Sequence, residues 1–330
     1  MGRGESHRAI LDRRFGHGFV CFDDVEIEMN SVNLSGVRAV VVGMARSGVA
    51  AVELLVKKGA QVTAVDQNPA SNARLSKLGV AVVPQTAASF QGAELVVLSP
   101  GVPADLDLLK GLCVIGDLEL ASWFMRGDIA GITGSNGKTT TTALTGHILR
   151  ECGIAAQVGG NIGTPPCFMV DSSRDGQWNV LELSSFQLET TDSFRARVGA
   201  ALNVTADHLD RHYTMENYVA AKGRLFRNQK TGDVAVLNAD DVYTRGYAVE
   251  TPADVRWFSS THEVGGAWLC GSELVIDGEV LMPASEVPLR GVHNLENTLA
   301  AALIARVAGA KRSQIREQSL ETGILLQRTD

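Results

Sequence analysis

The sequence lacks several features that would assign it to common classes of protein. Its five cysteines show no short paired spacing, so neither a disulfide framework nor a zinc site is indicated. No apolar run approaches the roughly 18 to 20 residues of a membrane span, and charges stand where a signal peptide has its apolar core. The net charge of -7 argues against nonspecific binding of nucleic acid. These absences predict a globular protein of the reducing cytoplasm.

What the chain does have is length, apolar content and glycine. Its 330 residues, 45% hydrophobic and including 34 glycines, allow two domains with separate cores. Residues 1–30 are different, because they cluster charges and glycines without a period of 2 or 3.6. We predict that residues 1–30 are an extension outside the fold, either disordered or not native.

Two series of alternating strands and helices follow. RAVVVG, SGVAAVELLVKKG and QVTAVD predict a βαβ unit that starts at Arg38, and a second series begins near Asp128. Such alternation is typical of α/β folds with a mostly parallel sheet. We therefore predict a Rossmann-like domain over residues 31–120 and a central P-loop-type ATPase domain over residues 121–320. Short strand signals over residues 254–288 predict a small antiparallel excursion.

The stretch GITGSNGKTTT, residues 131–141, has the context of a phosphate-binding loop: a strand, a glycine-rich turn and a helix. The usual pattern G-x-x-x-x-G-K-[ST] has a glycine where Ile132 stands, and here the glycine is Gly134 instead. Amide groups at the helix start would bind polyphosphate, Lys138 would reach the outer phosphates and Thr139 would bind Mg2+. The alternative is a simple helix-capping turn, which the lysine and the threonines disfavour.

Three polar residues occupy informative positions, and for two of them, His208 and Lys222, the pattern leaves two interpretations open. Glu182 ends an apolar strand, where a carboxylate needs a cation such as Mg2+. His208 follows a strand and falls at a carboxyl edge, where it is either structural or a ligand. Lys222 lies in the apolar stripe of the helix MENYVAAKGRLF, so it either extends its ammonium to solvent or becomes a neutral amine.

The turn GMARSG, residues 43–48, follows the first strand of the first domain. Taken by itself it is a degraded dinucleotide fingerprint, because Ala45 stands where a second glycine would let the backbone approach a pyrophosphate. It is therefore weak evidence for NAD.

The phosphate-loop variant T-G-[ST]-N-G-K-[ST]-T resembles that of the Mur ligases, ATP-dependent enzymes that add amino acids during peptidoglycan synthesis. The resemblance covers roughly residues 34–320, and within the family LELSSFQLE is similar to the D-glutamate-adding members. Its further motifs are GDLELA (116–121), GGNIGTPP (159–166), LELSSFQLETT (181–191), NVTADHLDRH (203–212), MENYVAAKGRLF (215–226), LNADD (237–241) and GVHNLENTLAAA (291–302).

The resemblance implies two sets of binding residues. ATP would contact the phosphate loop and two asparagines of the last helix: Gly134, Ser135, Asn136, Gly137, Lys138, Thr139, Thr140, Asn294 and Asn297. The UDP-sugar substrate would contact residues of both domains: Arg46, Ser47, Asp66, Gly101, Asn161, Ser184 and Gln187.

The implied reaction forms an acyl phosphate on the terminal carboxylate of UDP-N-acetylmuramoyl-L-alanine, which the amine of D-glutamate then attacks. Lys138, Glu182, His208 and Lys222 would be the catalytic residues. Two Mg2+ sites are implied, with Thr139, Glu182, His208 and a carbamate on Lys222 as ligands. We expect a cytoplasmic monomer without membrane or nucleic-acid partners.

Two alternatives remain at this point. One is another ligase of the same superfamily, either a different Mur ligase or a folylpolyglutamate synthase. The other is a nucleotide-binding protein without catalysis, because residues 321–330 would be only the truncated start of the family's third domain, which supplies the amino-acid site. On that reading the 330 residues alone are expected to be inactive.

Overall fold

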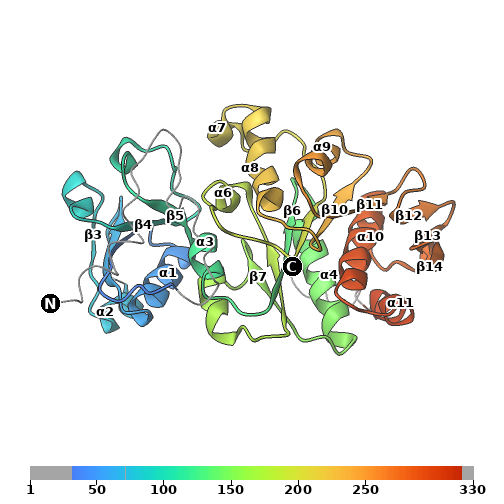
Figure 1. The fold of residues 1–330 in the computed structure, drawn as a ribbon, viewed down its shortest axis with the longest axis horizontal. Coiled ribbons are helices and arrows are strands. Elements are labelled where there is room, and N and C mark those ends of the chain that lie inside the picture. Colours follow the sequence, from blue (N-terminus) through green and yellow to red (C-terminus); the bar gives the residue numbers. More distant parts are fainter. Residues whose placement is uncertain (1–31, 71, 322–330) are drawn as a thin grey trace. The chain divides into compact units, whose positions relative to one another are not determined.

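The computed structural model describes residues 32–70 and 72–321, with side chains through Ser319 (Figure 1). Its contacts divide it into two compact units. Unit 1 holds the described residues up to Met125 together with Pro165–Asp171 and Thr190–Phe194, and unit 2 holds the remaining described residues. The predicted extension over residues 1–30 lies outside the described residues, as does the predicted third-domain start apart from Glu321.

Unit 1 is built on a five-stranded sheet in the order β3-β2-β1-β4-β5, and all neighbouring strands are parallel. Strands β1, β4 and β5 are short runs of mostly buried apolar residues, as expected for a sheet covered on both faces. The strands are β1 (Arg38–Val42), β2 (Gln61–Asp66), β3 (Val82–Pro84), β4 (Leu95–Leu98) and β5 (Val114–Gly116). The helices are α1 (Arg46–Lys57), α2 (Ala73–Lys77), α3 (Asp117–Ser122) and α5 (Pro166–Met169).

A buried carboxylate explains why a segment from far along the chain belongs to unit 1. Glu119 of α3 is fully buried and accepts hydrogen bonds from the amides of Asp192, Ser193 and Phe194 at 2.8–2.9 Å. The indole Nε1 of Trp123 donates to it as well, at 2.9 Å. A buried charge is tolerated only when it is hydrogen-bonded in this way, so residues 190–194 are held against α3.

Unit 2 is built on a nine-stranded mixed sheet in the order β14-β13-β12-β11-β10-β9-β6-β8-β7. The strands are β6 (Asp128–Thr133), β7 (Ala156–Gly160), β8 (Trp178–Glu182), β9 (Val198–Ala201), β10 (Val234–Asn238), β11 (Asp254–Ser259), β12 (Gly266–Cys270), β13 (Glu273–Ile276) and β14 (Glu279–Pro283). The antiparallel section is smaller than residues 254–288, because β11 pairs in parallel with both β10 and β12. A helix connects β10 to β11, and such a crossover returns the chain in the same direction.

Helices cover both faces of the nine-stranded sheet (Figure 1). One layer contains α4 (Lys138–Glu151), α10 (Val292–Val307) and α11 (Arg312–Glu321), and the other contains α6 (Ser185–Leu188), α8 (Met215–Arg227) and α9 (Val242–Glu250). The short helix α7 (Leu209–His212) contacts α8. Because β6, β8 and β9 run in the same direction, the loops that follow them meet at one edge of the sheet.

Two findings bear on the absences noted in the sequence. Within the described part of the chain, no helix combines the length and the apolar content that a membrane crossing requires. Cys113 is disulfide-bonded, whereas Cys152, Cys167 and Cys270 are free thiols. The disulfide at Cys113 was not predicted, because cysteine spacing along the chain does not show which cysteines the fold brings together.

Candidate active site

The loop after β6 makes a glycine-dependent turn into α4. Gly137 caps the helix with a φ of +82°, a left-handed conformation that favours glycine. A Cβ atom at this position would lie 2.2 Å from Oδ1 of Asn297. The turn therefore needs glycine for two reasons, and it presents the first-turn amides of α4 as donors to an anion.

Neighbouring loops at the same edge hold the phosphate loop in place. The amide of Ser135 donates to the carbonyl oxygen of Asn203 at 2.9 Å, and the amide of Asn136 donates to the Asn203 side chain at 2.8 Å. The Ser135 hydroxyl bonds the carbonyl oxygen of Thr205 at 3.0 Å and lies 3.1 Å from the hydroxyl of Tyr218. These contacts tie the phosphate loop to the segment after β9 and to α8.

Two lysines share one carbonyl of this loop. Lys138 Nζ donates to the carbonyl oxygens of Gly134 and Ser135 at 2.8 and 2.9 Å, and Lys222 Nζ donates to that of Gly134 at 2.9 Å. Lys222 is 1% exposed, so its ammonium does not extend to solvent. Burial, with the charge of Lys138 adding to it, lowers the pKa of Lys222 to about 7, and Asp207 opposes the shift. A large fraction of neutral amine is therefore present near pH 7.

Burial also lowers the pKa of Lys138, although the carboxylates of Glu182 and Asp207 oppose that shift. The loop thus concentrates positive charge at its centre, and polyphosphate is the kind of ligand that such charge attracts.

Glu182 occupies the end of β8 and is 2% exposed. Its carboxylate accepts a hydrogen bond from the Thr139 hydroxyl at 2.8 Å and another from the Asn161 side-chain amide at 3.0 Å. A hydroxyl and a carboxylate side by side at a phosphate loop are the oxygen donors that Mg2+ prefers. The structure thus brings together three residues that the sequence singled out, and their donor chemistry fits a magnesium ion.

His208 lies in a loop at the same edge and has a φ of +52°. Its side chain is half exposed, its Nε2 lies 3.4 Å from a carboxylate oxygen of Asp207, and its ring is 5.0 Å from that of Phe186. Tyr218 is a common neighbour of His208, at 6.4 Å between rings, and of Lys222, whose Nζ is 4.5 Å from the ring. Residues 32–70 and 72–321 contain no group of three His, Cys, Asp or Glu side chains arranged to hold a metal.

The two asparagines predicted to contact ATP begin α10. Asn297 is 5% exposed, accepts from the Thr141 hydroxyl at 3.3 Å and donates to the Asn294 side chain at 3.2 Å. Asn297 therefore packs against the glycine turn of the phosphate loop. The sequence motif identified the residue but not this contact, which depends on how α10 packs against α4.

Ser184 and Gln187, two of the residues predicted to bind the UDP-sugar, form a capping box at the start of α6. The Ser184 hydroxyl accepts from the amide of Gln187, and the Gln187 side chain accepts from the amide of Ser184, each at 3.2 Å. These two hydrogen bonds cap the helix.

In unit 1, the other residues predicted to bind the UDP-sugar lie near the turn between β1 and α1. Asp66 ends β2, and its carboxylate accepts from the amide of Met44 at 2.7 Å and from that of Asn68 at 2.9 Å. Arg46 and Ser47 begin α1, and Gly101 follows β4, so all of them lie on the carboxyl side of the sheet. Strands β1, β2 and β4 are parallel, which is why these loops meet.

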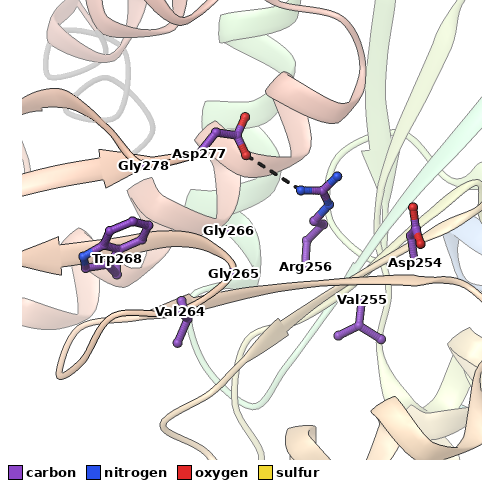
Figure 2. A pocket seen from close by; sticks show the side chains of 9 residues that line it. All are labelled: Asp254, Val255, Arg256, Val264, Gly265, Gly266, Trp268, Asp277 and Gly278. Carbon is purple, nitrogen blue, oxygen red and sulfur yellow. Dashed lines mark ion pairs between the residues drawn. The ribbon is translucent and has the colours of Figure 1, made fainter.

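A cavity of about 550 Å3 opens at the opposite, amino edge of the nine-stranded sheet (Figure 2). It is lined by the start of β11, the turn before β12 and the turn between β13 and β14. Arg256 and Asp277 form an ion pair across it at 3.8 Å. None of the residues that the sequence predicted for ATP, metal or substrate lines this cavity.

Comparison with known families agrees with this geometry. A model of the Mur ligase middle domain matches residues 132–305, and a model of the Mur ligase MurD-like N-terminal domain matches residues 37–115. The chain belongs to the Mur ligase family.

Individual relatives give a finer comparison. The chain is 56% identical over 291 residues to the UDP-N-acetylmuramoylalanine--D-glutamate ligase of Solibacter usitatus, covering 86% of this chain and 66% of that protein. It is 42% identical over 303 residues to the ligase of the same name from Koribacter versatilis, covering 87% and 67%. The chain thus spans about two thirds of the length of these relatives.

Solved structures support the fold. The UDP-N-acetylmuramate:L-alanyl-gamma-D-glutamyl-meso-diaminopimelate ligase from Neisseria meningitides matches with a TM-score of 0.61 at 18% identity, covering 87% of this chain and 98% of that chain. A murein peptide ligase from Psychrobacter arcticus matches with a TM-score of 0.57 at 18% identity, covering 87% and 68%. At this identity the likeness concerns the fold alone.

Proposed function

We propose that this chain contains the nucleotide and UDP-sugar sites of an ATP-dependent ligase that adds D-glutamate to UDP-N-acetylmuramoyl-L-alanine in peptidoglycan synthesis. Support comes from the relatives named for that reaction and from the MurD-like N-terminal match. The observation that carries the proposal is the cluster of Lys138, Thr139 and buried Glu182 at the phosphate loop.

The proposed chemistry starts from a poor electrophile, the terminal carboxylate of the UDP-sugar substrate. One of its oxygens attacks the γ-phosphorus of ATP, ADP leaves, and an acyl phosphate forms. The amine of D-glutamate then attacks the acyl carbon, phosphate leaves with the bonding electrons, and the amine loses a proton. The chain's own contribution to the first step is positive charge, because Lys138 and the amino end of α4 stabilise the transferring phosphoryl group.

The residues at the loop fit the magnesium that such reactions use. Thr139 and Glu182 would hold the ion of the ATP complex, and we propose Glu182, His208 and a carbamylated Lys222 as ligands of a second ion. When bound, these ions neutralise the repulsion between ATP and the substrate carboxylate.

Carbamylation of Lys222 is proposed because its surroundings favour a neutral amine, the form that reacts with CO2. The side chain is buried, and burial lowers its pKa to about 7. Modification would also remove the cost of burying an ammonium group. A crystal structure at high bicarbonate tests this, and a bare ammonium that points to solvent would contradict it.

For the UDP-sugar, we propose binding by Arg46, Ser47, Asp66 and Gly101 in unit 1. The roles of Asn161, Ser184 and Gln187 in unit 2 stay predictions that rest on the family resemblance. Support comes from the position of the first four on the carboxyl side of their sheet, where parallel α/β sheets bind ligands. A cytoplasmic, monomeric state is part of the same proposal and rests on the family resemblance.

The decisive experiment measures ADP and phosphate release from ATP with UDP-N-acetylmuramoyl-L-alanine, with and without D-glutamate, and identifies the product by mass spectrometry. Because the chain matches two thirds of its named relatives, we expect calorimetry to show UDP-sugar binding and weak ATP binding, and no ligated product. Robust D-glutamate-dependent ligation would show that these 330 residues suffice. A preference for another amino acid or for a folate would reassign the reaction within the superfamily.

A further inference from the structure

The segment that carries His208 has an unusual backbone at both ends. His208 has a φ of +52° and Tyr213 a φ of +67°, and the four-residue helix α7 lies between them. Neither residue is glycine, so this conformation persists only where surrounding contacts hold it. The position of the His208 imidazole therefore depends on what holds α7 down.

One contact is made at the rim by Arg211. Its guanidinium forms an ion pair with Glu189 and lies 5.2 Å from the ring centre of Phe186. The side chains of Arg211 and Glu189 remain 16% and 19% exposed. This partly exposed ion pair restrains one side of α7.

The inner contact is made by His212, which is 5% exposed. Its Nε2 lies 2.9 Å from the hydroxyl oxygen of Ser185, and its ring stacks on Phe186 with 5.4 Å between centroids. On the other side the ring lies 5.2 Å from Tyr218. His212 thus fills the space between α6 and α8 and is hydrogen-bonded within it.

The rings that enclose His212 also support the candidate active site. Phe186 is the ring against which His208 packs, at 5.0 Å. Tyr218 lies under the Nζ of Lys222 and places its hydroxyl 3.1 Å from the Ser135 hydroxyl of the phosphate loop. Loss of the His212 ring would therefore leave Phe186 and Tyr218 free to move, and the imidazole of His208 with them.

We propose that His212 is a positioning residue that fixes the His208 imidazole for metal binding through its packing between Phe186 and Tyr218 and its bond to Ser185. This inference rests on the proposed function, which makes His208 a magnesium ligand. His212 itself touches no substrate or metal in this proposal. Residues that orient a ligand typically contribute tenfold to 100-fold to metal affinity.

The test replaces Mg2+ by Mn2+ and uses this chain with ATP. Pulsed electron paramagnetic resonance detects the nitrogen coupling of an imidazole bound to Mn2+. Calorimetry with Mn2+ added to the chain already saturated with the Mn2+–ATP complex gives the affinity for the second ion. We expect His212→Ala to lose the nitrogen coupling and to bind the second Mn2+ about tenfold more weakly. His212→Phe keeps the packing and loses the bond, so it should retain part of the coupling.

Leu209→Ala is the matched control, because Leu209 lies on the same helix, is uncharged and is 37% exposed. It should leave coupling and affinity unchanged. His208→Ala identifies the source of the signal. Should the wild-type coupling vanish in His208→Ala and persist at full strength in His212→Ala, the positioning role is wrong while the proposed ligand stands. If the wild type shows no coupling that His208→Ala removes, both the ligand role of His208 and this inference fail.

Ser185→Ala separates the positioning role from local unfolding of His212→Ala, because it removes only the bond to Nε2. With circular dichroism unchanged, Ser185→Ala should weaken the nitrogen coupling less than His212→Ala does. Full coupling in both Ser185→Ala and His212→Phe would overturn the proposal.

Discussion

The two units use the same strand–turn–helix design with opposite electrostatics. In unit 1 the turn after β1 gives its Met44 amide to a carboxylate, that of Asp66, at 2.7 Å. In unit 2 the loop after β6 gives its Asn136 amide to the neutral side chain of Asn203 at 2.8 Å, and two lysines lie on the loop carbonyl of Gly134.

The two turns share a strand–turn–helix backbone but differ in the side chains around it. We infer that these side chains, and not the backbone alone, decide which anion each turn binds. In the first turn a carboxylate already accepts the Met44 amide, whereas the second loop adds two cationic or titratable amines to its helix amides. Variants in one of the two units can therefore be compared with variants in the other.

The largest effect is expected from the lysine that only the second loop has. Lys138→Ala should lower the affinity for Mg2+–ATP by on the order of 100-fold, since truncation of one partner of a charged hydrogen-bonded pair costs about 3 kcal/mol. Arg46→Ala at the first turn should weaken UDP-sugar binding and leave ATP affinity unchanged. Calorimetry with both ligands checks this, and wild-type ATP affinity in Lys138→Ala would remove the phosphate-loop role.

The next prediction concerns the loss of stability when a Cβ atom is added to a glycine in each turn. A Cβ atom at Gly48 would lie 1.8 Å from the backbone oxygen of Gly43, whereas one at Gly137 would meet the side chain of Asn297 at 2.2 Å. Backbone cannot move aside as a side chain can, so Gly48→Ala should lower the free energy of unfolding by about 2–4 kcal/mol. Gly137→Ala should cost about 1–2 kcal/mol, mostly from its positive φ.

Gly246→Ala is the control for these two variants. Gly246 lies inside α9, and a Cβ there has open space. It should gain about 0.5–1 kcal/mol of stability in denaturant unfolding, because alanine is the better helix former. Equal losses in Gly48→Ala and Gly137→Ala would contradict the distinction between the two turns.

Asp66 and Asn203 are the side chains that accept the loop amides of Met44 and Asn136. Exchanging their residue types tests the effect of the carboxylate charge alone. Asn203→Asp places a carboxylate at the phosphate loop, as unit 1 has, and removes the amide that donates to Asn136 at 3.2 Å. ATP affinity should fall about tenfold, equivalent to about 1.4 kcal/mol, and the loss should shrink at high salt. Asp66→Asn serves as the reciprocal variant and should leave ATP affinity unchanged. An unaltered ATP affinity in Asn203→Asp would show that charge at this acceptor is irrelevant.

The last prediction is a pH dependence of stability that Lys222 of unit 2 should carry. Lys222 binds a proton in the unfolded chain up to its ordinary pKa of 10.5, but in the folded protein only below a pKa of about 7. The unfolded state therefore holds more protons between pH 7 and 10.5, and stability rises with pH in that window by at most about 1.4 kcal/mol per pH unit. Below pH 7 both states are protonated and this contribution is constant.

Lys222→Met should remove this slope. Denaturant unfolding of both proteins in CO2-depleted buffer at pH 7, 8 and 9 checks it, because without CO2 the amine stays unmodified. Parallel slopes for the two proteins would mean that the buried amine keeps its ordinary pKa.

Local features of the fold could be predicted from the sequence because their causes are local. The loop at 134–139 follows from its glycines and flanking apolar runs. The apolar stripe that contains Lys222 is reproduced in α8, but the stripe alone left open whether the Lys222 amine is buried. The adjacency of Thr139 and Glu182 follows from two parallel strands that end at one edge.

Contacts between distant segments could not be predicted in the same way. Nothing near Glu119 indicates that its carboxylate accepts amides from residues 192–194, and nothing near His212 indicates the ring cluster that it joins. Asn203 and Asn297 were visible in motifs, yet their support of the phosphate loop depends on tertiary packing. The roles proposed for the site residues stay predictions until the experiments above are done.

The division of unit 1 along the chain has a practical consequence for cutting and recombining the protein. The chain enters or leaves unit 1 at five points, after residues 125, 164, 171, 189 and 194. A fragment that stopped at Met125 would keep Glu119 and lose the three amides that solvate its charge. A chimaera that takes unit 1 from a relative therefore has to include Pro165–Asp171 and Thr190–Phe194 as well. The gene segments that encode this unit are not contiguous.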